Sequence, residues 1–179
     1  MRRPYFYDKD RSKPNSKMVK LINKINKIVE YICIFLMFTL FSLLTVGVLA
    51  RYIFNSPIIW QYELSQVLFV WLMFLGGTVA FFDYQHITIK FFVNALPQIA
   101  RNLSKILVSL GIFIFSIIVI KEGFMLVQAF SSRNFRTVPI SIGWLYAAPP
   151  ISFIIILFYN IVFSFLKQDK IKNKHKLME

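Results

Sequence analysis

Three stretches of the chain lack any charged residue over roughly the length of a membrane crossing. Residues 31–50, 64–82 and 137–166 contain 20, 19 and 30 uncharged residues, respectively. A fourth stretch, residues 106–130, has a similar length but is interrupted by Lys121 and Glu122. A helix needs roughly 20 consecutive apolar residues to cross the hydrocarbon core of a bilayer. Because backbone polar groups in lipid must be satisfied within their own segment, these four stretches predict transmembrane helices.

The overall composition agrees with a lipid-embedded protein. Of the 179 residues, 57% are hydrophobic, 17% are aromatic and 16% are charged. A soluble domain has about 45–50% apolar and about 25% charged residues. We therefore predict an all-α membrane protein of one domain, with spans at about residues 31–51, 61–82, 105–130 and 144–166. The first apolar run and the stretch before it are both too long for a signal peptide, so we expect this segment to be retained.

The basic residues are distributed unevenly around these spans. Of 21 lysines and arginines, 17 lie before the first span, between the second and third, or after the fourth. Arg51, Arg133 and Arg136 lie on the opposite side, and Lys121 lies within the third span. This positive-inside pattern predicts that both termini, with basic tails at residues 1–14 and 167–179, are on the cytoplasmic side of the inner membrane. The net charge of +13 is then explained by topology and by attraction to lipid head groups, and not by nucleic-acid binding.

Two segments have the pattern of helices that lie on a membrane surface. Between residues 15 and 30, apolar residues recur at spacings of three and four opposite a basic face; they are Met18, Leu21, Ile22, Ile25, Ile28 and Val29. This pattern predicts an amphipathic helix in the cytoplasmic interface, and the alternative is an extension of the first span. A second such element is predicted around Pro97, where Phe92, Leu96, Ile99 and Leu103 share one face.

The start of the fourth span is left open by two adjacent prolines. Pro149 and Pro150 lack backbone N–H donors. Either the span begins just before them, or a bent segment from Ile142 precedes them.

The sequence contains no motif typical of catalysis or of a bound cofactor. It has no glycine-rich phosphate loop, and its single cysteine, Cys33, can form neither an internal disulfide nor a metal cluster. His86 lies just past the second span and His175 lies in the basic tail, so the chain offers no pair of histidines for haem within the membrane. No serine or cysteine nucleophile can be matched with a histidine on the same side. We predict that the protein is not an enzyme and holds no cofactor or metal.

A few polar residues lie where burial in lipid is costly. Glu63 and Gln66 share a face at the start of the second span, and Arg51 ends the first span just before the Asn55-Ser56-Pro57 turn. Charges at membrane depth usually pair with one another, so we expect Glu63 to pair with Arg51 or with Lys121. The alternative is that each charge extends to the lipid head groups.

Tryptophan and glycine residues in the second span indicate packing sites. Trp60 lies at the predicted outer membrane boundary, where an aromatic belt is expected. Trp71 lies about 16 Å further along the helix, where its indole N–H needs a protein partner or it simply packs among phenylalanines. Gly76, Gly77 and Ala80 form a small-residue face that allows another helix to approach closely.

One segment of the chain resembles a known family. Residues 51–64 read Arg-Tyr-Ile-Phe-Asn-Ser-Pro-Ile-Ile-Trp-Gln-Tyr-Glu-Leu and are followed by Phe69-Val70-Trp71, Phe74-Leu75-Gly76 and His86-Ile87. This order of residues resembles the small membrane subunit of tripartite ATP-independent periplasmic (TRAP) transporters. Family members have four helices, cytoplasmic termini and a comparable length.

The resemblance implies a role in a three-part uptake system. An extracytoplasmic substrate-binding protein captures an organic acid, such as sialic acid or a dicarboxylate, and a large membrane subunit moves it with sodium by an elevator motion. The small subunit braces the large one in the membrane lipid. Carried over by position, six residues are implied as fold or subunit-contact residues: Arg51, Trp60, Glu63, Trp71, Gly76 and His86.

Other residues join these candidates on the residue pattern alone. Gln66, Gly77 and Lys121 are further candidates for subunit contact or a structural role, and Arg133 and Arg136 are candidates for docking the binding protein. Two other functions remain open at this point. They are a membrane anchor subunit of a respiratory complex and an autonomous small transporter.

Overall fold

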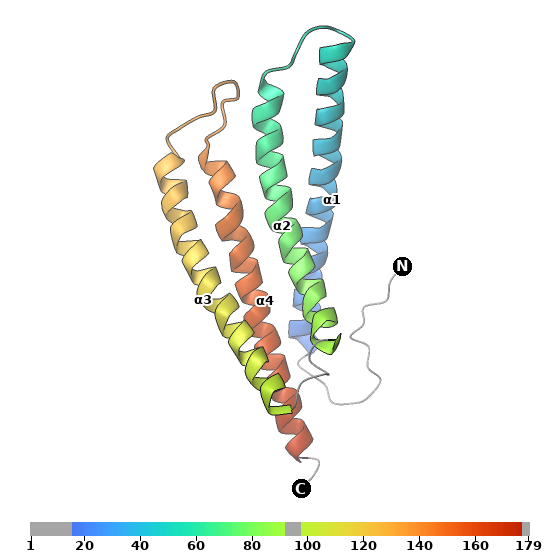
Figure 1. Ribbon diagram of the computed structural model, residues 1–179, viewed down its shortest axis with the longest axis vertical. Coiled ribbons are helices and arrows are strands. Elements are labelled where there is room, and N and C mark those ends of the chain that lie inside the picture. The colour runs from blue at the N-terminus through green and yellow to red at the C-terminus, as the bar shows by residue number, and fades with distance from the viewer. Residues whose placement is uncertain (1–15, 92–97, 177–179) are drawn as a thin grey trace.

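The computed structural model describes the backbone of residues 16–91 and 98–176, and the side chains of residues 18, 20–83 and 107–164. The chain forms four helices, α1 (Ser16–Tyr52), α2 (Trp60–Phe91), α3 (Gln98–Phe130) and α4 (Gly143–Lys176) (Figure 1). Within the described residues, one isolated bridge between Asn134 and Ser141 is the sole strand-like pairing. The all-α fold predicted from the sequence is confirmed.

Each helix contains one segment long and apolar enough to cross a membrane. These segments are Lys20–Tyr52, Trp60–Asp83, Leu107–Phe130 and Gly143–Ser164. The helices have 37, 32, 33 and 34 residues. At a rise of about 1.5 Å per residue, all four exceed the roughly 30 Å thickness of the hydrocarbon core. Their charge-rich ends therefore extend past the apolar segments, mainly at the starts of α1 and α3 and the ends of α2 and α4.

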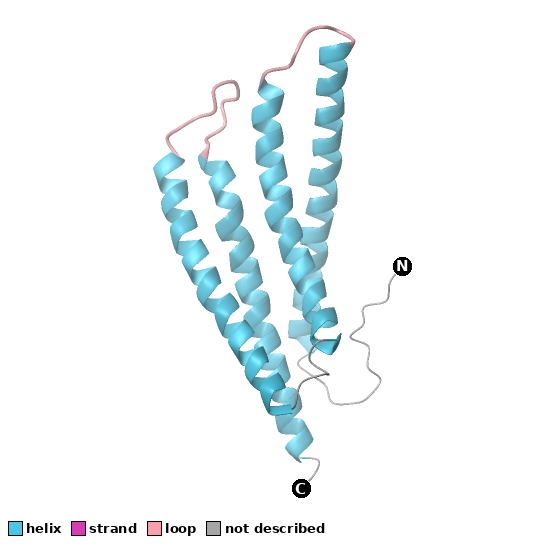
Figure 2. Cartoon of the chain, viewed as in Figure 1, coloured by secondary structure: helices cyan, strands magenta, loops and turns pink. Residues whose placement is uncertain are grey.

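The helices run alternately up and down. α1 packs against α2, α3 packs against α4, and α4 also packs against α2. Both long connections, residues 53–59 and 131–142, lie at one end of the bundle, which we call the loop end (Figure 2). The start of α1 and the end of α4 lie at the opposite end, which we call the terminal end (Figure 1).

Large apolar side chains cover the outside of the bundle. Phe35, Phe38 and Phe41 on α1 are 68%, 71% and 69% exposed, respectively. In water this surface would be unfavourable, whereas in lipid an exposed apolar side chain costs nothing. The buried apolar cluster, formed by Ile22, Tyr159 and Val162, is correspondingly small.

The segment predicted to lie in the membrane interface is part of α1. The helix continues without interruption from Ser16 through the first span to Tyr52, as the alternative of an extended span requires. Ile22 packs against Tyr159 and Val162 of α4, and Val29 is also buried. Met18, Leu21 and Ile28 remain exposed. Part of the apolar stripe thus covers the bundle itself, and contact of the remainder with the membrane surface stays a prediction.

The other two boundary questions have different outcomes. Residues 92–97, with Pro97, lie outside the described part of the chain, and α3 begins at Gln98, inside the predicted second interfacial element. The helix α4 begins at Gly143 and includes Pro149 and Pro150, so helical residues precede both prolines. A Cβ atom added to Gly123 of α3 would lie 2.9–3.1 Å from the Pro150 ring. The two helices therefore touch at Gly123 and Pro150.

Candidate functional site at the loop end

The connection between α3 and α4, residues 131–142, is a short hairpin that we call the α3–α4 hairpin. The amide of Phe135 donates to the carbonyl of Ile140 at 3.0 Å, and the amide of Ile142 donates to the carbonyl of Arg133 at 2.8 Å. The Ser141 hydroxyl donates to the Ser131 carbonyl at 2.7 Å. These bonds fix both arms of the hairpin. The backbone amides of its tip, residues 136–138, need acceptors outside the hairpin.

The side chain of Glu63 supplies those acceptors. Its carboxylate accepts hydrogen bonds from the backbone amides of Arg136 at 3.0 Å, Thr137 at 2.9 Å and Val138 at 3.1 Å. The Thr137 hydroxyl donates to the same carboxylate. Successive backbone amides in a turn form a concave anion-binding site, and charged acceptors make the stronger hydrogen bonds. Glu63 thereby ties the tip of the hairpin to the first turn of α2.

This arrangement overturns the predicted pairing of Glu63 with a cation. Arg51 donates instead to the hydroxyl of Tyr62, and its Cζ atom lies 5.7 Å from the centre of the Tyr62 ring. Lys121 is exposed on α3. Three amides and a hydroxyl already surround the carboxylate, so it needs no ion pair to be satisfied.

The two arginines of the hairpin are exposed to solvent. Arg133 lies with its Cζ atom 5.3 Å from the centre of the Phe130 ring. Arg136 contributes its backbone amide to Glu63. With Arg51, these residues place three exposed positive charges at the loop end, while the carboxylate of Glu63 is engaged by the hairpin.

Tryptophan residues connect α2 and α4 just below the hairpin. The indole N–H of Trp71 donates to the carbonyl of Trp144 at 3.0 Å, so the protein partner considered for this residue is a backbone carbonyl of α4. Trp60 and Trp144 are 45% and 59% exposed at the loop end, as an aromatic belt requires. Tyr146 packs on Phe130 with ring centres 4.8 Å apart.

Two polar contacts between helices were missed by sequence reasoning. The buried Gln61 amide donates to the Leu43 carbonyl at 3.1 Å and lies over Gly47, where a Cβ atom would be only 1.6 Å from Oε1. Ser109 donates to Asn160 Oδ1 at 2.9 Å, and Asn160 Nδ2 donates back to the Ser109 carbonyl at 3.0 Å. An amide within an apolar span was the available signal for Asn160, because such a group needs a partner in lipid.

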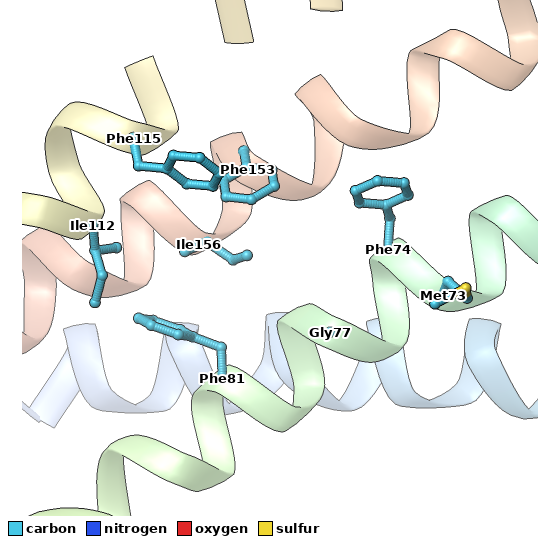
Figure 3. A pocket seen from close by; sticks show the side chains of 8 residues that line it. All are labelled: Met73, Phe74, Gly77, Phe81, Ile112, Phe115, Phe153 and Ile156. Carbon is cyan, nitrogen blue, oxygen red and sulfur yellow. The ribbon is translucent and has the colours of Figure 1, made fainter. Parts of the chain in front are cut away.

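The predicted small-residue face of α2 makes no close helix–helix contact at Gly76 or Gly77 within the described part of this chain. A Cβ atom added to Gly76 or Gly77 would meet nothing within 4 Å, and Gln66 on the same helix is exposed. Gly77 lines an apolar groove of about 280 Å³ between α2, α3 and α4. Figure 3 shows Gly77 between Phe74 and Phe81, facing Phe115 of α3 and Phe153 of α4.

The remaining candidates are His86 and the residue types that bind metal ions. His86 lies in the last turns of α2, and its side chain is outside the described part. Among the described side chains, no group of three or more His, Cys, Asp or Glu residues could hold a metal ion. The polar groups at the loop end and within the spans mainly join one element of the bundle to another.

Four membrane-length helices joined by these contacts define a multi-pass membrane protein. The family model for tripartite ATP-independent periplasmic transporters, DctQ component, matches residues 40–168. The chain belongs to this family, and it is therefore a transporter component of the inner membrane.

Two relatives illustrate the family. The chain is 32% identical over 119 residues to the sialic acid TRAP transporter permease protein SiaT of Haemophilus influenzae (strain 86-028NP). This match covers 65% of this chain and 19% of that protein. It is 27% identical over 136 residues to the sialic acid TRAP transporter small permease protein SiaQ of Vibrio cholerae serotype O1, covering 76% of this chain and 75% of that protein. The chain thus spans about a fifth of the length of the first relative and three quarters of the second.

Proposed function

We propose that this protein is the small membrane subunit of a sodium-driven TRAP transporter that takes up an organic acid, and that sialic acid is its first candidate substrate. The family match over residues 40–168 carries this proposal. The names of both relatives support the choice of substrate. In this role the chain braces a large membrane subunit that performs the transport.

The relative SiaT supports the existence of a large partner. The similarity to this chain covers 19% of that permease, so most of that polypeptide lies outside the region that matches this chain. For this protein we expect a separate, larger membrane chain to perform the function of that additional part. The open space beside Gly76 and Gly77 provides a place on α2 where a helix of such a partner would pack closely.

The polar groups of the spans support an accessory role. Gln61, Trp71 and Asn160 each bond to a neighbouring helix of the same chain. Groups that bind a transported solute or ion in a membrane normally line a cavity, and they include unpaired carboxylates or backbone carbonyls. The groove at Gly77 is instead lined by apolar residues.

The positive-inside pattern supports a cytoplasmic position for the terminal end. Lys20, Lys24 and Lys27 are exposed there on α1. The loop end, with its arginines and aromatic residues, then faces the extracytoplasmic side where a substrate-binding protein approaches.

The test of this function is co-purification from the native membrane. We expect a much larger multi-span protein to be recovered with this chain in an equal amount. Recovery of the chain by itself, or with a haem-containing enzyme, would contradict the proposal.

Reversing the charges of the two hairpin arginines should reduce uptake without dissociating the membrane complex. In an Arg133→Glu/Arg136→Glu variant we expect uptake to fall about tenfold or more at low ionic strength, because charged patches steer association. The main-chain bond from residue 136 to Glu63 is independent of the side chain. Uptake and complex recovery are measured in parallel.

The charge-preserving variant Arg133→Lys/Arg136→Lys is the matched control. It should retain uptake, since it keeps both positive charges at the same positions. Full uptake by the reversed variant would remove the docking role of these two residues.

A further inference from the structure

Two buried polar groups at the terminal end lack hydrogen-bond partners within the described part of the chain. They are the hydroxyl of Tyr159 on α4 and the Oδ1 atom of Asn26 on α1. The Tyr159 side chain is fully buried, and Asn26 is 8% exposed. Each group has lost its contact with bulk solvent, and no described residue replaces that contact with a hydrogen bond.

The packing brings these two residues to the same part of the bundle. Tyr159 is at the centre of a cluster that includes Ile22 and Ile25 of α1. Asn26 directly follows Ile25 and lies one turn after Ile22, on the face of α1 that Ile22 presents to the cluster. Phe82 of α2 packs against the Tyr159 ring at 5.4 Å between ring centres. The ring of Tyr159 is thus enclosed by residues of both α1 and α2.

Neither group can be satisfied by its own helix. The buried hydroxyls of Ser65 and Ser152 also lack partners among the described residues, but a helical serine reaches the carbonyl one turn earlier by rotating about χ1. A tyrosine hydroxyl stands at the far end of a rigid ring, out of reach of its own backbone. The amide oxygen of Asn26 accepts only, and the N–H groups around it are used by the helix.

We propose that one buried water molecule joins Tyr159 to Asn26. The tyrosine hydroxyl donates to the water, and the water donates to Oδ1 of Asn26. Buried waters typically satisfy such groups with two to four hydrogen bonds. Exposed Lys20, Lys24 and Lys27 on the same stretch of α1 show that this level of the bundle borders a polar medium. The water adds a polar link between α1 and α4, whose other contact in this cluster is apolar.

The sign of the change in thermal midpoint caused by a single substitution tests the proposal. Tyr159→Phe removes one oxygen atom and keeps the ring packing. If the hydroxyl is hydrogen-bonded, the thermal midpoint of the full chain in detergent falls by about 2–4 °C. If the hydroxyl is simply unsatisfied, its removal leaves the midpoint unchanged or raises it, and the proposal is overturned.

A double-mutant cycle identifies the partner. Asn26→Leu should also lower the midpoint, and Tyr159→Phe combined with Asn26→Leu should be no worse than the more damaging single change. Additive losses would contradict a shared link. Asn26→Ala replaces the leucine variant if leucine prevents folding, and Tyr31→Phe, at a residue that is 70% exposed on α1, should leave the midpoint unchanged.

An experimental map that resolves ordered waters distinguishes a bridge from a direct bond. The proposal requires one water within hydrogen-bonding distance of both atoms. Direct contact between the hydroxyl and Oδ1, or a separate partner for each, would overturn it.

Discussion

A Gly123→Leu variant will unfold at a markedly lower temperature than the parent protein, because α3 and α4 can no longer approach each other as closely at Pro150. Even a Cβ atom at this position would lie 2.9 Å from Cδ and 3.0 Å from Cγ of Pro150. The proline ring is rigid and its backbone is fixed within α4, so neither side can move aside without separating the helices. Overpacking a tight contact costs about 1–3 kcal/mol or more. A loss of about 3 kcal/mol lowers the thermal midpoint of a chain of this size by about 6–12 °C.

The matched control for this change is Gly111→Leu on the same helix. Gly111 is exposed, and a Cβ atom there would meet nothing within 4 Å. The midpoint of the control should stay near that of the parent protein, and Gly123→Ala should fall between the two. Equal midpoints for the leucine variants at positions 123 and 111 would show that the contact with Pro150 does not hold the helices together.

Replacing Glu63 by alanine will release the α3–α4 hairpin from α2. The amides of Arg136, Thr137 and Val138 lose their acceptor, and the Thr137 hydroxyl loses it too. We expect hydrogen exchange of these three amides to accelerate by about an order of magnitude or more, because the tip then opens without unfolding the helices. Exchange at the centre of α2 should not change. The measurement is hydrogen–deuterium exchange on the detergent-solubilised chain.

Two further variants separate the contributions at Glu63. Glu63→Gln keeps one acceptor oxygen and removes the charge, so the tip should be intermediate in protection. Glu122→Gln removes an exposed acid on α3 and should leave the hairpin unchanged. If the amides of residues 136–138 remain protected in Glu63→Ala, the carboxylate is not what fixes the hairpin.

At the loop end, the positions where the helices begin and end could be predicted closely from the sequence. Charge and turn residues mark them clearly: Arg51 closes the first uncharged run, and Asn55 adopts a positive φ of 50° in the turn that follows. The predicted spans therefore end or begin within one residue of the helices on that side. At the terminal end the helices extend well beyond the apolar segments, because lysine has a high helix propensity and a lysine-rich sequence does not end a helix.

The contacts of Glu63 could not be read from the sequence. Its partners are main-chain amides of a loop 73–75 residues away, and every residue except proline carries such an amide. Charge pairing therefore pointed to Arg51 and Lys121 as partners of Glu63. In the structure Arg51 donates to the Tyr62 hydroxyl, and Lys121 is exposed. The contact of Gly47 with Gln61 was missed for a related reason, since it depends on how far α1 and α2 are shifted along each other.

The interfacial prediction for residues 15–30 shows the limit of helical periodicity. The spacing correctly indicates a helix with one apolar face. It does not say whether that face meets lipid or protein, because both are apolar. Ile22 and Val29 are buried in the structure, whereas Leu21 is exposed.

Reconstitution into vesicles tests the central claim most directly. The purified chain is inserted alone, or together with its co-purifying large membrane protein and the substrate-binding protein, and uptake of sialic acid is followed under an inward sodium gradient. We expect no uptake by the chain alone and sodium-dependent uptake by the complete set. Uptake by this chain without the large protein would contradict it.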